Sequence, residues 1–148
     1  MNRSSFLKGC FAVGSFLITP FAAMAKINIG SRAEDGFKVD AGKDRFDEAI
    51  SLFDGDTFHC KVSAKDTNND IYIFESTRDK KGGPPLHVHF EQDEFWYILE
   101  GEFLFKVGDQ TFIARAGDSI FGPRRIPHAF AKVNNKSEKM LMAFQPAG

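Results

Sequence analysis

The sequence predicts an all-β domain, arranged as a sandwich or a barrel. From Thr57 onward, short apolar and β-branched runs alternate with segments rich in Gly, Pro, Asp and Asn, which is typical of many short strands joined by turns. Hydrophobic residues make up 43% of the 148-residue chain and charged residues 26%. Because both fractions are ordinary for a globular protein, we expect one compact domain with its own core.

Residues 1–25 are predicted to be a cleaved secretory signal peptide. Arg3 and Lys8 give the segment a positive start, residues 10–18 form its apolar centre, and an Ala-Met-Ala sequence ending at Ala25 fits a small-x-small cleavage site. The apolar run is too short and too interrupted for a membrane span. We therefore expect a periplasmic or secreted protein with no membrane partner after cleavage, and an uncleaved anchor is the alternative.

Residues 26–56 are predicted to be an N-terminal extension that packs on a barrel formed by residues 57–148. The extension allows two interpretations. Phe46, Ala49, Ile50 and Phe53 have helical spacing, yet the same segment is equally compatible with strands laid across the barrel edge.

The barrel itself is predicted strand by strand from the positions of turn residues. Turns are expected at residues 66–70, 108–109 and 116–118, where Asp, Asn and Gly gather. The strands expected between these and other breaks are residues 57–65, 71–77, 95–99, 103–107, 111–115, 119–121, 128–133 and 140–144.

The charge of the chain gives no sign of a polyanionic partner. The formal net charge is −1, and removal of residues 1–25 leaves 17 basic and 20 acidic residues. No basic stripe is present along the sequence, which argues against nucleic acid as a partner. A small molecule is the expected partner.

Three of the four histidines, together with one glutamate, are candidate metal ligands: His87, His89, Glu94 and His128. In a strand, residues i and i+2 point to the same face, so His87 and His89 are expected to project side by side. A hairpin after residues 91–93 is expected to bring Glu94 back beside them. His128 arrives from a later segment, after a turn at Pro123 and Pro127.

This donor set predicts one divalent transition metal as cofactor. Imidazole nitrogen and carboxylate oxygen suit iron, manganese, nickel, copper or zinc, and the sequence does not choose between these ions. Each candidate also has a simpler interpretation. The His-x-His pair is compatible with a surface or core position, the acidic residues with a solvated turn, and His128 with an ordinary loop.

The chain resembles the cupin superfamily over roughly residues 57–146, through two motifs. The first cupin motif places Gly after His-x-His and Glu at fixed spacing, and the matching residues are His87, His89, Glu94 and Gly101. The second motif, Gly-x5-Pro-x-Gly-x2-His-x3-Asn, is matched by Gly117, Pro123 and His128. Arg125 replaces its second glycine and Lys132 its asparagine, which affects the local turn geometry and leaves the ligand positions intact.

The resemblance implies a double-stranded β-helix, the jelly-roll barrel, which is one of the all-β architectures. It is nearest to small single-domain cupins of the quercetin-dioxygenase-like subgroup. This implies a metal-dependent oxidoreductase acting on a small hydroxylated aromatic compound, with Glu94 as catalytic base. The alternatives are a non-enzymatic ligand-binding cupin and a metal-dependent isomerase or decarboxylase. Cupins are often dimers, so a homodimer is the assembly to consider.

The substrate pocket is predicted to be aromatic. Phe130 shares a strand face with His128, and Trp96 shares one with Glu94, so both rings are expected to line the pocket beside the metal. Such a pocket favours a flat organic substrate over a small dianion such as oxalate, which would need cationic groups. Arg115, Arg124 and Arg125 are interpreted as solvent-facing or loop residues.

Overall fold

The computed structural model describes residues 32–52 and 55–148, so the predicted signal peptide lies outside the described residues. The described part consists of strands and one short 3-10 helix, η1 (Lys65–Thr67). The strands are β1 (Ile50–Leu52), β2 (Asp56–Val62), β3 (Tyr72–Arg78), β4 (Asp93–Glu100), β5 (Glu102–Val107), β6 (Gln110–Arg115), β7 (Ser119–Gly122), β8 (His128–Lys132) and β9 (Glu138–Gln145).

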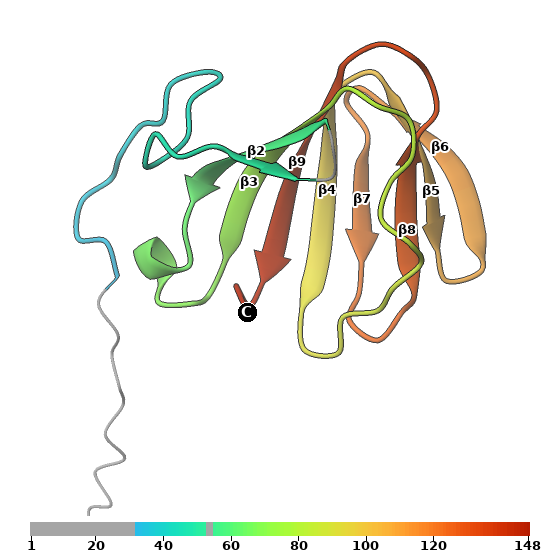
Figure 1. Cartoon of the computed structure of the whole chain (residues 1–148). Helices are drawn as coiled ribbons and strands as arrows, with labels where there is room; N and C mark the ends of the chain where they lie inside the picture. Colours follow the sequence, from blue (N-terminus) through green and yellow to red (C-terminus); the bar gives the residue numbers. More distant parts are fainter. Residues whose placement is uncertain (1–31, 53–54) are drawn as a thin grey trace, which may run out of the picture.

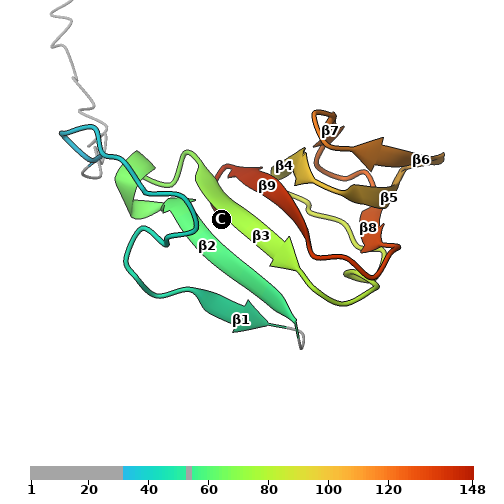
Figure 2. The same cartoon turned by 90° about the horizontal axis from the view of Figure 1, so that it is seen from above.

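The strands form two antiparallel sheets, as the all-β prediction requires. Six strands pair in the order β1-β2-β3-β9-β4-β7, and three pair in the order β6-β5-β8. The smaller sheet lies at the β4–β7 end of the larger one, whereas β1 and β2 extend away from it (Figures 1 and 2). Because β9 pairs between β3 and β4, strands distant in sequence lie side by side.

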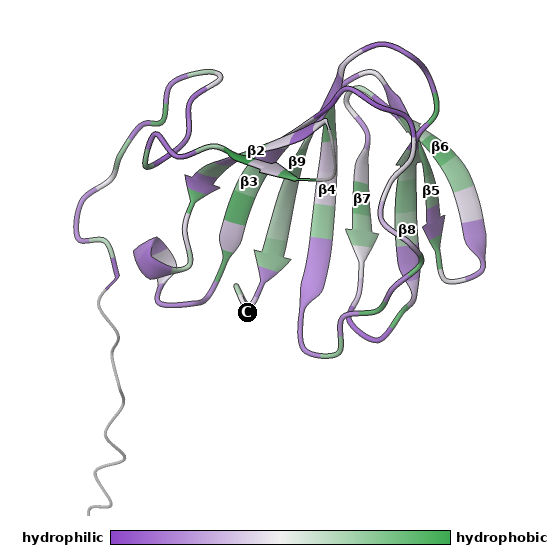
Figure 3. Cartoon of the chain, viewed as in Figure 1, coloured by the Kyte–Doolittle hydropathy of each residue, from purple (hydrophilic) through white to green (hydrophobic). Residues whose placement is uncertain are grey.

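The core lies between the two sheets, at positions set by the two-residue period of the strands. In β4, Trp96 and Ile98 are fully buried, while Phe95, Tyr97 and Leu99 on the other face remain partly exposed. The remaining buried apolar side chains are Phe74, Phe103, Phe105, Ala114, Ile120, Phe130, Met140 and Met142. Hydrophobic residues accordingly follow the strands, and hydrophilic residues gather in the connecting loops (Figure 3).

The N-terminal extension contains a strand and no helix among residues 32–52. Ile50 to Leu52 pairs with β2 as an edge strand, so the helical spacing of the segment is not realised. Asp44 holds the preceding loop against the sheet, because its carboxylate accepts hydrogen bonds from the backbone N–H groups of Phe46 (2.8 Å) and Cys60 (2.5 Å). Backbone pairing with β2 thus competes successfully with the local helical pattern. Among the described residues, no helix is long and apolar enough to cross a membrane.

Residues 79–92, hereafter the strap, connect β3 to β4 and lie against β8 (Figure 1). Backbone hydrogen bonds join Gly82 to Lys132 in both directions, at 3.0 and 2.9 Å, and join His87 to His128 in the same way, at 3.0 and 2.9 Å. The strap is therefore fastened at two points to one strand of the smaller sheet.

Lys132, which stands in place of the motif asparagine, fixes the base of the strap. The side chain is 1% exposed, and its Nζ donates hydrogen bonds to the carbonyl oxygens of Asp79 (3.0 Å) and Asn134 (2.7 Å). A buried ammonium needs such partners, since desolvation without them is costly. The departure from the motif thus has a structural role in joining β8 to the strap.

We expect Gly83→Ala to destabilise the protein through the strap. A Cβ at residue 83 would lie 1.8 Å from the carbonyl oxygen of Phe130, so the strap and β8 would have to separate. The expected loss is about 2–3 kcal/mol of unfolding free energy, measured by urea denaturation. Gly36→Ala is the matched control, because a Cβ there meets nothing within 4 Å. Equal stability of the two variants would contradict the close approach.

Candidate metal centre

The four predicted ligands come from three separate segments that the fold brings together. His87 and His89 lie on the strap, Glu94 is the second residue of β4, and His128 is the first residue of β8. The strap is extended but forms only isolated bridges, so the predicted regular strand and hairpin around His87 and His89 are absent. Pairing of His87 with His128 replaces the hairpin as the interaction that aligns the ligands.

The ligand atoms of His87, His89, Glu94 and His128 all lie within 4.8 Å of one another. Glu94 Oε2 is 3.1 Å from His128 Nε2 and 3.3 Å from His89 Nε2. The ring centroid of His87 is 4.7 Å from that of His128 and 5.0 Å from that of His89. The cluster is therefore compact enough to surround one ion.

Backbone carbonyls select the imidazole nitrogens that face the centre. His87 Nδ1 lies 2.8 Å from the carbonyl oxygen of Pro85, and His128 Nδ1 lies 2.9 Å from that of Ile126. A carbonyl only accepts, so each Nδ1 carries the proton and donates it. The Nε2 lone pairs are then free to bind a cation, as in most metal-ligating histidines. The residues present thus fit a divalent transition metal, with three neutral imidazoles and one carboxylate.

Two imidazoles of the cluster have pKa values shifted in opposite directions. Burial opposes protonation of His128, but the hydrogen bond and the negative charge of Glu94, with the Ile126 carbonyl, outweigh it and raise the pKa of His128. Burial lowers the pKa of His89, and the neighbouring His87 and His128 add to this against the attraction of Glu94. Protonation of His128 and cation binding would therefore compete for the same Nε2, beside the Glu94 carboxylate.

The loop before His128 is tied to the other ligand segments. Asp93 accepts hydrogen bonds from the backbone N–H (2.8 Å), Nε (3.1 Å) and an Nη (2.7 Å) of Arg124. The backbone N–H of Arg125 donates to the carbonyl oxygen of His89 at 2.7 Å. Arg125 has φ 68°, the left-handed conformation that explains why the motif usually places glycine there.

Trp96 supports the centre from the core side. Its ring is 0% exposed and its centroid lies 5.3 Å from that of His128. Gly122 permits this packing, because a Cβ there would lie 2.7 Å from the indole ring. Trp96 is absent from the walls of the cavity described next, so its predicted place in the substrate pocket is not observed.

A cavity of about 450 Å³ opens beside the cluster. Its walls include His87, His89 and Glu94, and the aromatic rings of Phe58, Phe130 and Phe144. Phe130 thus lines the cavity that these candidate ligands border, and its role in a substrate pocket stays a prediction. Arg115, Arg124 and Arg125 do not line this cavity.

Arg78 and Asp56 also line the cavity, and the interpretation of the sequence omits both. Arg78 is 7% exposed and pairs with Asp56, its Nη lying 2.8 Å from the Asp56 carboxylate. The signal was present in the strand period, since Phe74, Ser76 and Arg78 alternate inward along β3. The sequence predicts an aromatic pocket that lacks the cationic groups an anion would need. That expectation is wrong, because Arg78 and Lys81 line the cavity.

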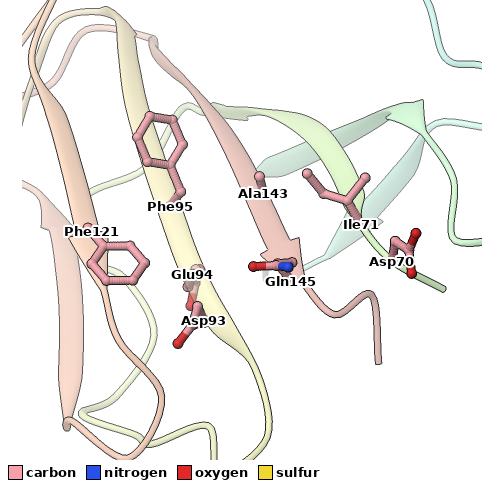
Figure 4. A pocket seen from close by; sticks show the side chains of 8 residues that line it. All are labelled: Asp70, Ile71, Asp93, Glu94, Phe95, Phe121, Ala143 and Gln145. Atoms are coloured by element: carbon pink, nitrogen blue, oxygen red, sulfur yellow. The ribbon is translucent and has the colours of Figure 1, made fainter. Parts of the chain in front are cut away.

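A second hollow, of about 410 Å³, lies on the outer face of the larger sheet (Figure 4). Phe95 of β4, Phe121 of β7 and Ala143 of β9 line this hollow. The strand period places Phe95 and Glu94 on opposite faces of β4. Glu94 is the one residue of the cluster that borders this hollow, and none of the three clustered histidines lines it.

Comparison with known families agrees with the motifs and the fold. Residues 74–144 match the Cupin domain family. The matched segment, just under half of the chain, contains all four residues of the cluster and both motifs. The two-sheet architecture confirms the predicted jelly roll.

Similar proteins support the cupin fold and do not define an activity. The chain is 34% identical over 61 residues to an uncharacterised protein of Methanocaldococcus jannaschii, a match that covers 41% of this chain and 49% of that protein. The chain thus spans about half the length of the curated relative it matches.

Two solved structures show the same fold at low sequence identity. An RmlC-like cupin from Shewanella frigidimarina is 21% identical, with a TM-score of 0.62, covering 79% of this chain and 96% of that one. A predicted oxalate decarboxylase from Thermotoga maritima is 22% identical, with a TM-score of 0.59, covering 67% of this chain and 90% of that one.

We expect His89→Ala to lower metal affinity at least tenfold, because the cluster loses one of its donors. Disturbing a metal site typically lowers metal affinity by roughly 10- to 100-fold. The side chain is 27% exposed, so its removal leaves no large core cavity. Titration of purified protein with Zn²⁺ or Fe²⁺ measures the effect. His59→Ala is the control, since His59 is the one histidine outside the cluster. Equal metal affinity in both variants would argue against the centre.

We expect Asp93→Asn to change the acid stability of the protein. Hydrogen bonds from the side chain and backbone of Arg124 lower the pKa of Asp93 to about 2 from the usual 3.8. Because the folded-state pKa is depressed, the stabilisation is present above the unfolded value and is lost as pH falls from 3.8 toward 2. Urea denaturation at several pH values should show lower stability at neutral pH and a flatter acid dependence in the variant.

Asp35→Asn is the control for this measurement, because Asp35 is an exposed aspartate outside the barrel strands. An acid dependence that is the same in wild type and Asp93→Asn would show that the pairing with Arg124 contributes nothing.

Proposed function

We propose that this cupin is an exported metal-dependent oxidoreductase of the dioxygenase type, acting on a small hydroxylated aromatic compound. The observation that carries the proposal is the position of the donor cluster at the wall of an aromatic cavity. His87, His89 and Glu94 face a space of about 450 Å³, which is within the usual range for small-molecule sites. A placement in the quercetin-dioxygenase-like subgroup is part of the same proposal.

The aromatic walls favour a flat substrate. Phe58, Phe130 and Phe144 come from three different strands and border the cavity together. The Phe144 ring also contacts His89 edge to face, with centroids 5.4 Å apart. Offset and edge-to-face contacts stabilise aromatic ligands beyond their burial, so a ring bound here would lie against the metal ligands.

A divalent ion held by His87, His89, Glu94 and His128 would supply Lewis acidity and, if redox-active, chemistry with dioxygen. The protein contributes the proton acceptor. Glu94 is 2% exposed, and its Oε2 lies between the imidazoles of His89 and His128. A substrate hydroxyl in the cavity would meet this carboxylate, which can take its proton while the three imidazoles hold their positions. Glu94 and His128 are buried, which shields these two side chains from bulk water.

Export belongs to the proposal through residues 1–25, whose sequence has the composition of a secretory signal. After cleavage Cys60 has no cysteine partner within the chain. This is compatible with a periplasmic or a secreted protein, because the apolar core between the two sheets supplies the stability.

A second candidate function is metal-dependent decarboxylation or isomerisation of a carboxylate compound. Arg78 favours it, because a buried cation in the cavity wall suits an anionic substrate. Product analysis separates the two activities: the dioxygenase consumes dioxygen, whereas a decarboxylase releases carbon dioxide without consuming it.

We expect Glu94→Gln to retain most of the metal and to lose turnover. Glutamine keeps an oxygen donor of similar size but does not accept the substrate proton, and loss of such a base costs on the order of 10²- to 10⁴-fold in rate. Oxygen consumption with a panel of flavonols and catechols, on metal-loaded protein, measures the effect.

Glu91→Gln is the matched control, since Glu91 is an exposed carboxylate on the strap, three residues before Glu94, and lies outside the cluster. Undiminished oxygen consumption in Glu94→Gln would end the base assignment. Ligand binding without oxygen consumption in wild type would favour a non-enzymatic binding protein.

A further inference from the structure

The cavity wall contains a buried guanidinium that the metal cluster does not use. Arg78 ends β3 and is 7% exposed, while Asp56 begins β2 directly opposite and is 2% exposed. Both side chains line the same cavity as His87, His89 and Glu94. A charged group is seldom buried at a cavity wall without partners, so the contacts of Arg78 determine what it can do.

The ion pair with Asp56 leaves much of the guanidinium available. One Nη lies 2.8 Å from Asp56 Oδ2, but that oxygen makes no aligned hydrogen bond within the described part of the chain. Arg78 Nε is also buried, and among residues 32–52 and 55–148 it has no hydrogen-bond partner. A guanidinium has five N–H donors in a planar fork. Arg78 and Asp56 therefore do not form the two parallel N–H···O hydrogen bonds of a bidentate arginine–carboxylate pair.

Phe130 holds the guanidinium in place. The Arg78 Cζ lies 5.1 Å from the centre of the Phe130 ring, within cation–π distance. Phe130 itself lies on β8, two residues from His128 along the strand. The cation is thus positioned by a strand that also carries a predicted metal ligand, and Arg78 and Phe130 both line the cavity.

The other ionisable groups of the cavity do not cancel this charge once a cation is bound. The wall carries Asp56, Lys81 and Glu94 besides Arg78 and the two imidazoles. Asp56 balances one positive charge, and Glu94 is a predicted metal ligand. Arg78 and Lys81 with a divalent ion then outweigh the two carboxylates, so the loaded cavity attracts anions.

We propose that Arg78 binds a carboxylate of the substrate, with its unpartnered Nε–H among the donors, so that the ligand is a hydroxylated aromatic carboxylate. The identification of this ligand as the substrate rests on the proposed function; the anion subsite itself rests on the geometry of Arg78. The aromatic rings would hold the ring of the ligand, its hydroxyl would face the metal cluster, and its carboxylate would meet Arg78.

The test compares acids with neutral amides of the same shape. The 2-, 3- and 4-hydroxybenzoates and the corresponding hydroxybenzamides are titrated calorimetrically into protein loaded with Zn²⁺, an ion without redox chemistry. We expect at least one acid to bind about tenfold more tightly than its amide, the scale of a charge-assisted hydrogen bond. Arg78→Met should remove this preference, and Arg78→Lys, which keeps the charge and loses the planar fork, should reduce it.

Arg115→Met is the matched control, because Arg115 is an arginine of β6 with a side chain 67% exposed and lies outside the cavity. It should leave the preference unchanged. If Arg78→Met does not unfold cooperatively, Arg78→Lys and the acid-to-amide comparison in wild type decide the question. Acid and amide affinities within twofold in wild type, or an unchanged preference in Arg78→Lys and Arg78→Met, would overturn the proposal.

Oxygen consumption of the metal-loaded protein separates this inference from the proposed function. Acid-selective binding without oxygen consumption by any acid or neutral phenol would leave the anion subsite intact and refute the oxidoreductase. Oxygen consumption with neutral phenols, together with no preference for acids, would support the oxidoreductase and refute the anion subsite.

Discussion

The geometry of the candidate site depends on the pairing of the strap with β8. Backbone hydrogen bonds between Gly82 and Lys132 and between His87 and His128 fix the strap at two points. The second pair places the imidazole of His87 beside that of His128, although the two residues are far apart in sequence. Nothing intrinsic to an extended, proline-containing segment would hold it in this position. The buried ammonium of Lys132 and the close approach of Gly83 to Phe130 maintain the contact.

The same pairing connects the chemistry of the cluster to the core. His128 is packed between the strap and Trp96, and its Nδ1 proton is directed to a backbone carbonyl. Its Nε2 therefore faces Glu94. Rigid packing behind a ligand reduces the reorganisation needed when a cation binds. The strap side of the cluster, with His87 and His89, faces the cavity, so one half of the donor set is held by the core and the other is open to a ligand.

Much of the fold could be predicted from the sequence because the turn residues and the two-residue period are local signals. The turn at Gly108 and Asp109 separates β5 and β6 at the predicted place, and the strands near Phe103 and Met140 differ from prediction by only a few residues. Spacing also identified the four clustered side chains, since the cupin motifs record positions at which distant segments meet. The sequence did not reveal how they meet, because a bridge between His87 and His128 is a tertiary contact.

The places of three side chains or segments depend on more than the motif spacing. Arg78 follows Phe74 and Ser76 on the inward face of β3, a position given by the strand period and outside both motifs. Trp96 was placed on the correct face of β4, but which inward residues line a cavity and which fill the core depends on neighbours in other strands. The helical spacing near Ile50 was overruled by pairing with β2.

The most direct test of the account is an anomalous-difference map from crystals of the metal-loaded protein, collected at the absorption edge of the bound ion. The account predicts one peak per chain, coordinated by His87, His89, Glu94 and His128, with the three imidazoles bound through Nε2. A peak elsewhere, or a peak coordinated by the other residues of the cavity without His128, would contradict it.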